Sequence, residues 1–146
     1  MPIKSFRGLI ANAGSETIVL HTNDGSTGYR IKKLDVMPQN GENILVESIM
    51  TVWTVAQSAV PTTIDFSNQE LIAAAVYGDD SNNSYRFNKA IIFDNITFNQ
   101  DIYIYFHSET GTAPNPYMNY YIELEQIKLD LNENTVATLK DIRNKA

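Results

Sequence analysis

Two histidines, His21 and His107, are the side chains of this chain best suited to transfer a proton near neutral pH. A hydrolase would pair one of them with a nucleophile, but the sequence has no Gly-x-Ser-x-Gly elbow and no cysteine. A metal site would need a close-spaced partner such as His-x-His, and neither histidine has one. An ordinary hydrogen-bonded or exposed histidine is therefore the favoured interpretation, and a small hydrolase is the weakest functional alternative.

Carboxylates are the next candidates for chemistry. Glu123 and Glu125 lie two residues apart on a predicted strand, whereas a glycosidase needs two carboxyl groups that face each other across a cleft. A pair on one strand face is more typical of a solvated edge or a row of ion pairs. Asp79, Asp80 and Asn82 offer oxygen ligands but lack the Asp-x-Asp-x-Asp-Gly ladder of a calcium-binding hand. The sequence thus predicts no catalytic residue, no cofactor and no metal site.

Tyrosine is the more informative residue type, since seven of the eight tyrosines lie at or after Tyr77. Tyrosine has an apolar body and a polar tip, and it is enriched where surfaces meet partners. These tyrosines either cover a second sheet within the fold, or line a subunit contact or a sugar-stacking platform. The platform is the weaker version because the one tryptophan, Trp53, stands in an apolar strand. The candidate contact residues are Tyr103, Tyr105, Tyr117, Tyr120 and Tyr121.

The segment 119–129 is the clearest of the elements that must position these side chains. Successive strand side chains point to opposite sides, and its apolar residues change from even to odd positions part-way. Those apolar residues are Tyr120, Ile122, Leu124, Ile127 and Leu129. One extra residue near Glu125–Gln126, a β-bulge, would bring all of them to the core side. The pattern predicts a bent strand of the kind found at the corners of sandwiches and barrels.

The rest of the chain also favours short strands, about eight or nine in all, with turn signals between them and no βαβ alternation. Further strands are predicted at residues 3–11, 16–22, 29–36, 44–55, 85–93 and 101–107. Asp24-Gly25 predicts a tight hairpin turn between two of them, because it accepts positive φ angles. The alternation slips between Ile31 and Leu34, and the strand 44–55 is apolar on both sides, which indicates a central position.

The segment Ser67–Gly78 is ambiguous. Ser67 and Glu70 match a capping box and its three alanines favour helix, but an apolar run of seven residues is more typical of a buried strand. We predict a strand here. Gly78–Ser84 and Glu109–Pro116 are predicted to be exposed loops and further contact candidates. The tail 132–145 has helical spacing and a charge order that suits the helix dipole, so it is expected to form a short helix.

Length, composition and charge limit the possible folds and functions of the chain. At 146 residues the chain is long enough for one core, and we expect a single domain over residues 1–146: an all-β, antiparallel β-sandwich or jelly-roll-like fold with a short C-terminal helix. No secretory signal is recognised, and no run approaches the ~20 apolar residues of a membrane span. A net charge of −6 argues against sequence-independent binding of nucleic acid.

Five segments, in order along nearly the whole chain, resemble a known group of proteins. The segments are Leu20-His21-Thr22-Asn23 with Gly28-Tyr29-Arg30-Ile31, Asn99-Gln100-Asp101-Ile102-Tyr103, Asn119-Tyr120-Tyr121-Ile122-Glu123-Leu124-Glu125, and Ala137-Thr138-Leu139-Lys140-Asp141-Ile142-Arg143. With them the chain resembles small virion structural proteins of marine tailed bacteriophages. The resemblance carries no catalytic motif, so it assigns no functional residue.

That resemblance implies a non-enzymatic protein of the virion, made in the host cytoplasm, which decorates or cements the head. Its expected partners are the major capsid protein or other virion proteins, together with further copies of itself, a trimer being the expected oligomer. The alternative is a carbohydrate-binding β-sandwich, either free or part of a tail or receptor-binding structure. That alternative predicts an exposed row of aromatic side chains and saturable binding to a polysaccharide.

Overall fold

The computed structural model of the protein describes residues 2–20, 26–39, 46–80, 85–110 and 117–129. These residues form strands and connecting turns, which confirms the predicted all-β class. The strands are β1 (Ile3–Ala11), β2 (Gly14–Ile18), β3 (Thr27–Pro38), β4 (Val46–Trp53), β5 (Leu71–Asp80), β6 (Tyr85–Ile92), β7 (Ile102–Thr110) and β8 (Tyr117–Lys128). The helix predicted at 132–145 lies outside the described residues.

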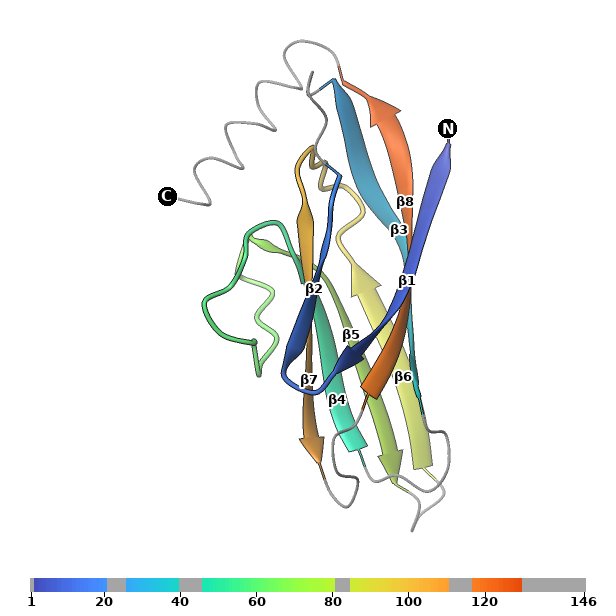
Figure 1. The fold of residues 1–146 in the computed structure, drawn as a ribbon, viewed down its shortest axis with the longest axis vertical. Coiled ribbons are helices and arrows are strands. Elements are labelled where there is room, and N and C mark those ends of the chain that lie inside the picture. Colours follow the sequence, from blue (N-terminus) through green and yellow to red (C-terminus); the bar gives the residue numbers. More distant parts are fainter. Residues whose placement is uncertain (1, 21–25, 40–45, 81–84, 111–116, 130–146) are drawn as a thin grey trace.

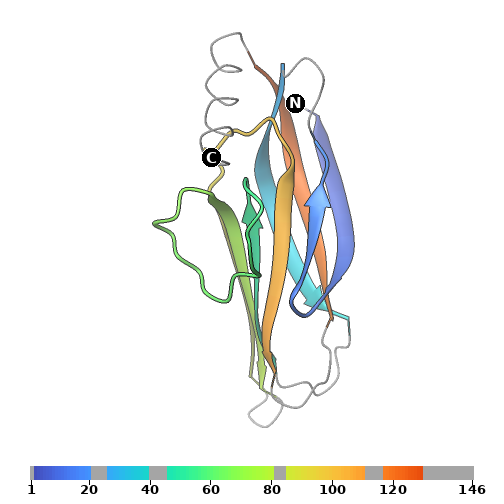
Figure 2. The same ribbon diagram turned by 60° about the vertical axis from the view of Figure 1, so that its left-hand side comes forward.

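Two antiparallel sheets face each other as a β-sandwich (Figures 1 and 2). One has three strands in the order β1-β8-β3, and the other has five in the order β2-β7-β4-β5-β6. Strand β8 is the centre of the smaller sheet and β4 is the centre of the larger one. The central position of β4 was predicted from its two apolar faces. A strand whose two faces are both covered by other parts of the protein contacts water on neither face.

The chain passes from one sheet to the other at the corner between β1 and β2. Ala13 adopts a left-handed φ of 61°, and a Cβ on Gly14 would lie 2.8 Å from the Ala11 carbonyl oxygen. The corner is fixed to β7, since the Asn12 side-chain oxygen accepts a hydrogen bond of 2.9 Å from the Ser108 amide. The turn expected between the first two strands is confirmed, and only glycine fits its close approach.

The prediction that the turn at Asp24-Gly25 joins two paired strands is wrong. Strand β2 pairs with β7 and strand β3 pairs with β8, so the two strands on either side of this turn belong to different sheets. Residues 21–25 themselves lie outside the described residues. A turn signal indicates that the chain reverses, but it does not specify which strand becomes the hydrogen-bonded neighbour.

The predicted slip in the alternation of β3 is confirmed as a bulge. Ile31 pairs with Leu124 and Lys33 pairs with Glu123, so Lys32 is an extra residue without its own partner on β8. Ile31 before the bulge and Leu34 after it are therefore both buried on the core side.

The bulge predicted near Glu125–Gln126 in β8 is wrong. Pairing with β3 continues one residue at a time from Leu124 to Lys128. A regular strand puts Ile127 and Leu129 on the opposite face from Leu124, and the two form a small buried cluster apart from the main core. The extra residue lies in the partner strand instead.

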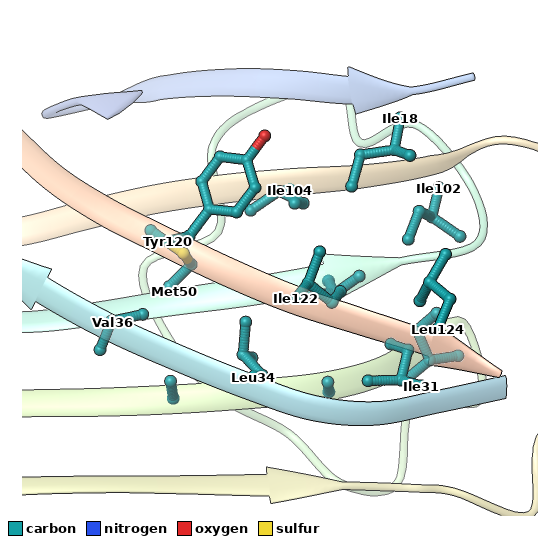
Figure 3. Packing of buried hydrophobic residues seen from close by; sticks show 14 of the residues in the cluster. Ile18, Ile31, Leu34, Val36, Met50, Ile102, Ile104, Tyr120, Ile122 and Leu124 are labelled. Carbon is teal, nitrogen blue, oxygen red and sulfur yellow. The ribbon is translucent and has the colours of Figure 1, made fainter. Parts of the chain in front are cut away.

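The core fills the space between the sheets. Ile122 and Leu124 of β8 and Ile102 and Ile104 of β7 are each 0% exposed. Figure 3 shows these side chains from the two sheets meeting in one apolar layer, with Met50 of β4 beside them. Inward residues alternate with outward ones along β7, as its sequence predicted.

Strand β5 settles the ambiguous segment in favour of a strand over residues 71–80. The capping-box residue Ser67 belongs to a turn, in which the Asp65 carboxylate accepts hydrogen bonds from the Ser67 amide at 2.9 Å and from its hydroxyl at 2.6 Å. The first residues of both predicted loops belong to strands instead. Strand β5 runs to Asp80 and β7 runs to Thr110, and residues 81–84 and 111–116 lie outside the described residues.

Candidate contact surfaces

Tyr103 and Tyr105 lie on the outer face of the five-stranded sheet, the face turned away from the core. Tyr105 is buried there in a second apolar cluster with Trp53 and Leu71, and Tyr103 packs against it while half-buried. The Tyr105 hydroxyl accepts a hydrogen bond of 2.7 Å from the Gln57 amide. It thereby anchors the segment between β4 and β5, which Figures 1 and 2 show as a green loop beside this sheet. Tyr105 and Trp53 have almost no surface left for a partner or a sugar.

Tyr120 lies between the two sheets. Its hydroxyl donates a hydrogen bond to the Glu16 carboxylate on β2, so the pair connects the three-stranded sheet to the five-stranded one. Figure 3 shows the Tyr120 hydroxyl directed away from β8 toward the opposing sheet. Burial raises the pKa of the Tyr120 phenol, and the hydrogen bond to Glu16 and the negative charge of Glu16 raise it further. Gly8 makes room, since a Cβ there would lie 2.8 Å from both the Glu16 carboxylate and the Tyr120 ring.

Tyr117 and Tyr121 lie on the outer face of the three-stranded sheet. Tyr117 is exposed, whereas Tyr121 is half-buried and donates a hydrogen bond of 2.7 Å to the Glu123 carboxylate. That hydrogen bond raises the pKa of the Tyr121 phenol. The Lys33 ammonium lies 5.9 Å from the centre of the Tyr121 ring, within the range of a cation–π contact. Of the five candidate tyrosines, Tyr117 and Tyr121 are therefore the ones on an open face.

The same face has an apolar end, here called the β8 patch and made up of Leu9, Met37 and Tyr117. These side chains are 38%, 68% and 42% exposed, respectively. Leu9 and Met37 stand on either side of Asn119 because both pair with it across the sheet. The patch therefore extends over all three strands, and their hydrogen-bonded ladders hold its backbone in place.

A second apolar surface, here called the β6 strip and made up of Phe66, Phe87 and Ile91, lies on the outer face of the five-stranded sheet. Its side chains are 53%, 43% and 37% exposed, respectively. The Phe87 ring lies over Gly78, where a Cβ would meet it at 2.9 Å. Phe66 contacts Phe93 edge-to-face with ring centres 5.2 Å apart. Since strand β6 pairs only with β5, the strip follows an edge of the sheet.

Of the residues first considered for chemistry, Glu123 and Glu125 have structural partners. Glu123 accepts the Tyr121 hydroxyl, and Glu125 lies 3.8 Å from the Lys32 ammonium, which agrees with the ion-pair interpretation. His107 is half-buried and pairs with Ile49 across the sheet. His21 and Asn82 lie outside the described residues.

Among the described residues, no group of three or more histidine, cysteine, aspartate or glutamate side chains is placed to hold a metal ion. None of these residues belongs to a helix of the length and apolar character that a membrane crossing requires.

Sequence reasoning did not find Leu9, Met37, Phe66 or Phe87. Phe66 and Phe87 are single apolar residues between polar neighbours, whereas Leu9 and Met37 stand next to the buried residues Ile10 and Val36. Single exposed apolar residues are common on protein surfaces. Only the register of β1 and β3 against β8 brings Leu9 and Met37 into one patch. The sequence signal that could have identified them is the strand alternation, which places both residues at outward positions.

No protein-family model matches the chain, and no curated protein matches its sequence. A functional proposal therefore depends on these surfaces and on the resemblance to phage virion proteins.

Proposed function

We propose that this chain is a non-enzymatic virion structural protein of a tailed bacteriophage, which decorates or cements the head through contacts between subunits. The observation that carries the proposal is the position of its two exposed apolar surfaces. The β8 patch lies on the outer face of one sheet and the β6 strip on the outer face of the other. A protein that bridges neighbours needs contact surfaces on opposite sides, whereas a binding module for one ligand needs a single site.

The physical character of both surfaces supports contact with protein. Antiparallel ladders fix the β8 patch and also Phe87 and Ile91 of the β6 strip, so little conformational entropy is lost when a partner covers them. Each combines large apolar side chains with charged neighbours, as in Phe87 and Ile91 on either side of Lys89. Apolar anchors within a polar rim are the usual composition of a protein–protein interface. The β6 strip is assigned to the major capsid protein or another virion protein.

The test is co-sedimentation of the purified chain with phage heads that lack it. Saturable binding and a higher temperature of head rupture are expected. The double variant Phe66→Ser/Phe87→Ser should lose binding, because it removes both aromatic anchors of the β6 strip. Val19→Ser is the matched control, since Val19 is an apolar side chain 66% exposed that belongs to neither surface.

Head binding that is absent, or equal for the double variant and the control, would overturn the proposal. Saturable binding of the chain to a polysaccharide in place of heads would favour the carbohydrate-binding alternative. The exposed aromatic side chains of the β6 strip would then be its stacking surface.

A further inference from the structure

We infer that the outer face of the three-stranded sheet is a two-fold contact between two copies of this chain. The inference deepens the proposed function, because it names the occupant of the β8 patch. It starts from the apolar end of the face and from the arrangement of charges next to that end.

The register places residues in rows across the face, with β8 in the middle. The two rows nearest the apolar end are Leu9, Asn119 and Met37, followed by Arg7, Tyr121 and Asp35. Arg7 on β1 and Asp35 on β3 are both exposed, and each lies one strand spacing, ~4.8 Å, from β8 on opposite sides. The face therefore carries a positive charge on one flank and a negative charge on the other, at the same height.

A two-fold axis lying in the interface and parallel to β8 exchanges the two flanks. Arg7 of each copy then faces Asp35 of the other, and Leu9 faces Met37 in the adjacent row. Asn119 and Tyr121 lie on the axis and meet their own equivalents. The same patch is thus complementary to itself, which is the requirement for an isologous dimer. Stacked sheets of this kind pack at ~10 Å with a small rotation.

Of the remaining charges on this face, Lys33 is compatible with the contact and Glu123 opposes it. Lys33 lies 3.5 Å from Asp35, but both side chains are well exposed, so that pair contributes little and leaves the carboxylate accessible to a second cation. Glu123 meets its own equivalent on the axis, which is unfavourable. Since packed sheets are rotated relative to each other, contact is closest near the apolar rows and the Glu123 row separates. The pairing favours a dimer over the trimer expected from the sequence.

Sedimentation of the purified chain over a range of concentrations tests this inference without any phage particle. The wild-type chain should show a monomer–dimer equilibrium that weakens at high salt. Arg7→Asp and Asp35→Arg should each raise the dissociation constant at least about tenfold, because like charges then face each other twice. An equimolar mixture of the two variants should restore dimers, since every pair across the axis is again of opposite sign.

A monomeric or trimeric wild-type chain, or a mixture that associates no better than either variant alone, would overturn the inference. The mixture keeps the test valid if one variant is slightly destabilised, because restored dimers show that both variants are still folded. Val19→Ser controls for the loss of an exposed side chain elsewhere. Failure here is separable from failure of the proposed function, because head binding is assigned to the β6 strip on the other sheet.

Discussion

At the scale of single residues, the hydrogen bond between Tyr120 and Glu16 connects the two sheets through side chains. A carboxylate near an apolar core is costly unless it is hydrogen-bonded, and the Tyr120 hydroxyl supplies that bond. Gly8 allows it, because any side chain there would collide with both groups. A tyrosine first considered for a subunit contact is thus a connection within the fold.

Tyr120→Phe should destabilise the protein by about 1.5–3 kcal/mol at pH 7, the typical worth of a hydrogen bond to a charged group. The raised pKa of Tyr120 means that the folded protein keeps a proton which the unfolded chain loses above pH ~10. The stabilisation is therefore complete below that pH and is lost as the pH rises further. Urea unfolding at neutral and alkaline pH should show the difference between wild type and Tyr120→Phe shrinking above pH ~10.

Tyr117→Phe is the control for that experiment, because the Tyr117 side chain is exposed on the outer face. It should leave the unfolding free energy nearly unchanged at both pH values. A wild-type advantage over Tyr120→Phe that stays constant into strongly alkaline solution would contradict the assignment.

At the scale of elements, the sequence predicts the strands and their inner faces far better than their partners. Alternation in β7 and the slip in β3 identified which side chains enter the core, because burial and side-chain period follow directly from residue type. Sheet membership depends on contacts between distant segments, so the turn after β2 was assigned to the wrong pairing. The parity change in β8 had two physical solutions, a bulge or a second buried cluster, and the sequence alone does not distinguish them.

The candidate site was predictable only in part for the same reason. Tyr117 and Tyr121 were named from composition and lie on an open face, whereas Tyr105 and Tyr120 are buried. A tyrosine at an outward strand position can still be covered by a connecting segment, as residues 54–70 cover Tyr105. That covering is tertiary structure and leaves no local pattern.

Deletion of Lys32 should leave the fold intact and change the unfolding free energy by no more than about 1 kcal/mol. The deletion removes the extra residue of β3, so Ile31 and Leu34 then follow regular alternation on the core side. The lost ion pair with Glu125 is partly exposed and contributes little. Chemical denaturation of the purified variant measures the change.

Deletion of Asp35 is the matched comparison. It would turn Val36, which is 5% exposed, away from the core and should cost at least about 1.5–3 kcal/mol for that side chain alone. Equal losses for the two deletions would show that the bulge does not absorb the change in register.

The Lys32 deletion variant should also aggregate more readily, because β3 is an edge strand and a bulge with charged residues protects such an edge.

At the scale of the whole molecule, the protein is a β-sandwich with an exposed apolar surface on the outer face of each sheet. In the proposed arrangement, the β8 patch would pair two copies and the β6 strip would attach them to the particle. Such a dimer presents two β6 strips, so it is able to join two neighbouring capsid subunits. The net charge of −6 favours solubility of the free chain, and in the proposed dimer the oppositely charged flanks of the β8 face would give the self-contact its specificity.

The most direct test of this two-sided account is hydroxyl-radical footprinting of Met37, Phe66 and Phe87, read by mass spectrometry. Methionine and phenylalanine side chains lose reactivity when a partner covers them. In the free dimer, Met37 should react severalfold less than in the Arg7→Asp variant, while both phenylalanines stay reactive. On phage heads all three should be protected. Phenylalanines that remain fully reactive on heads, or a Met37 equally reactive in dimer and variant, would contradict the account.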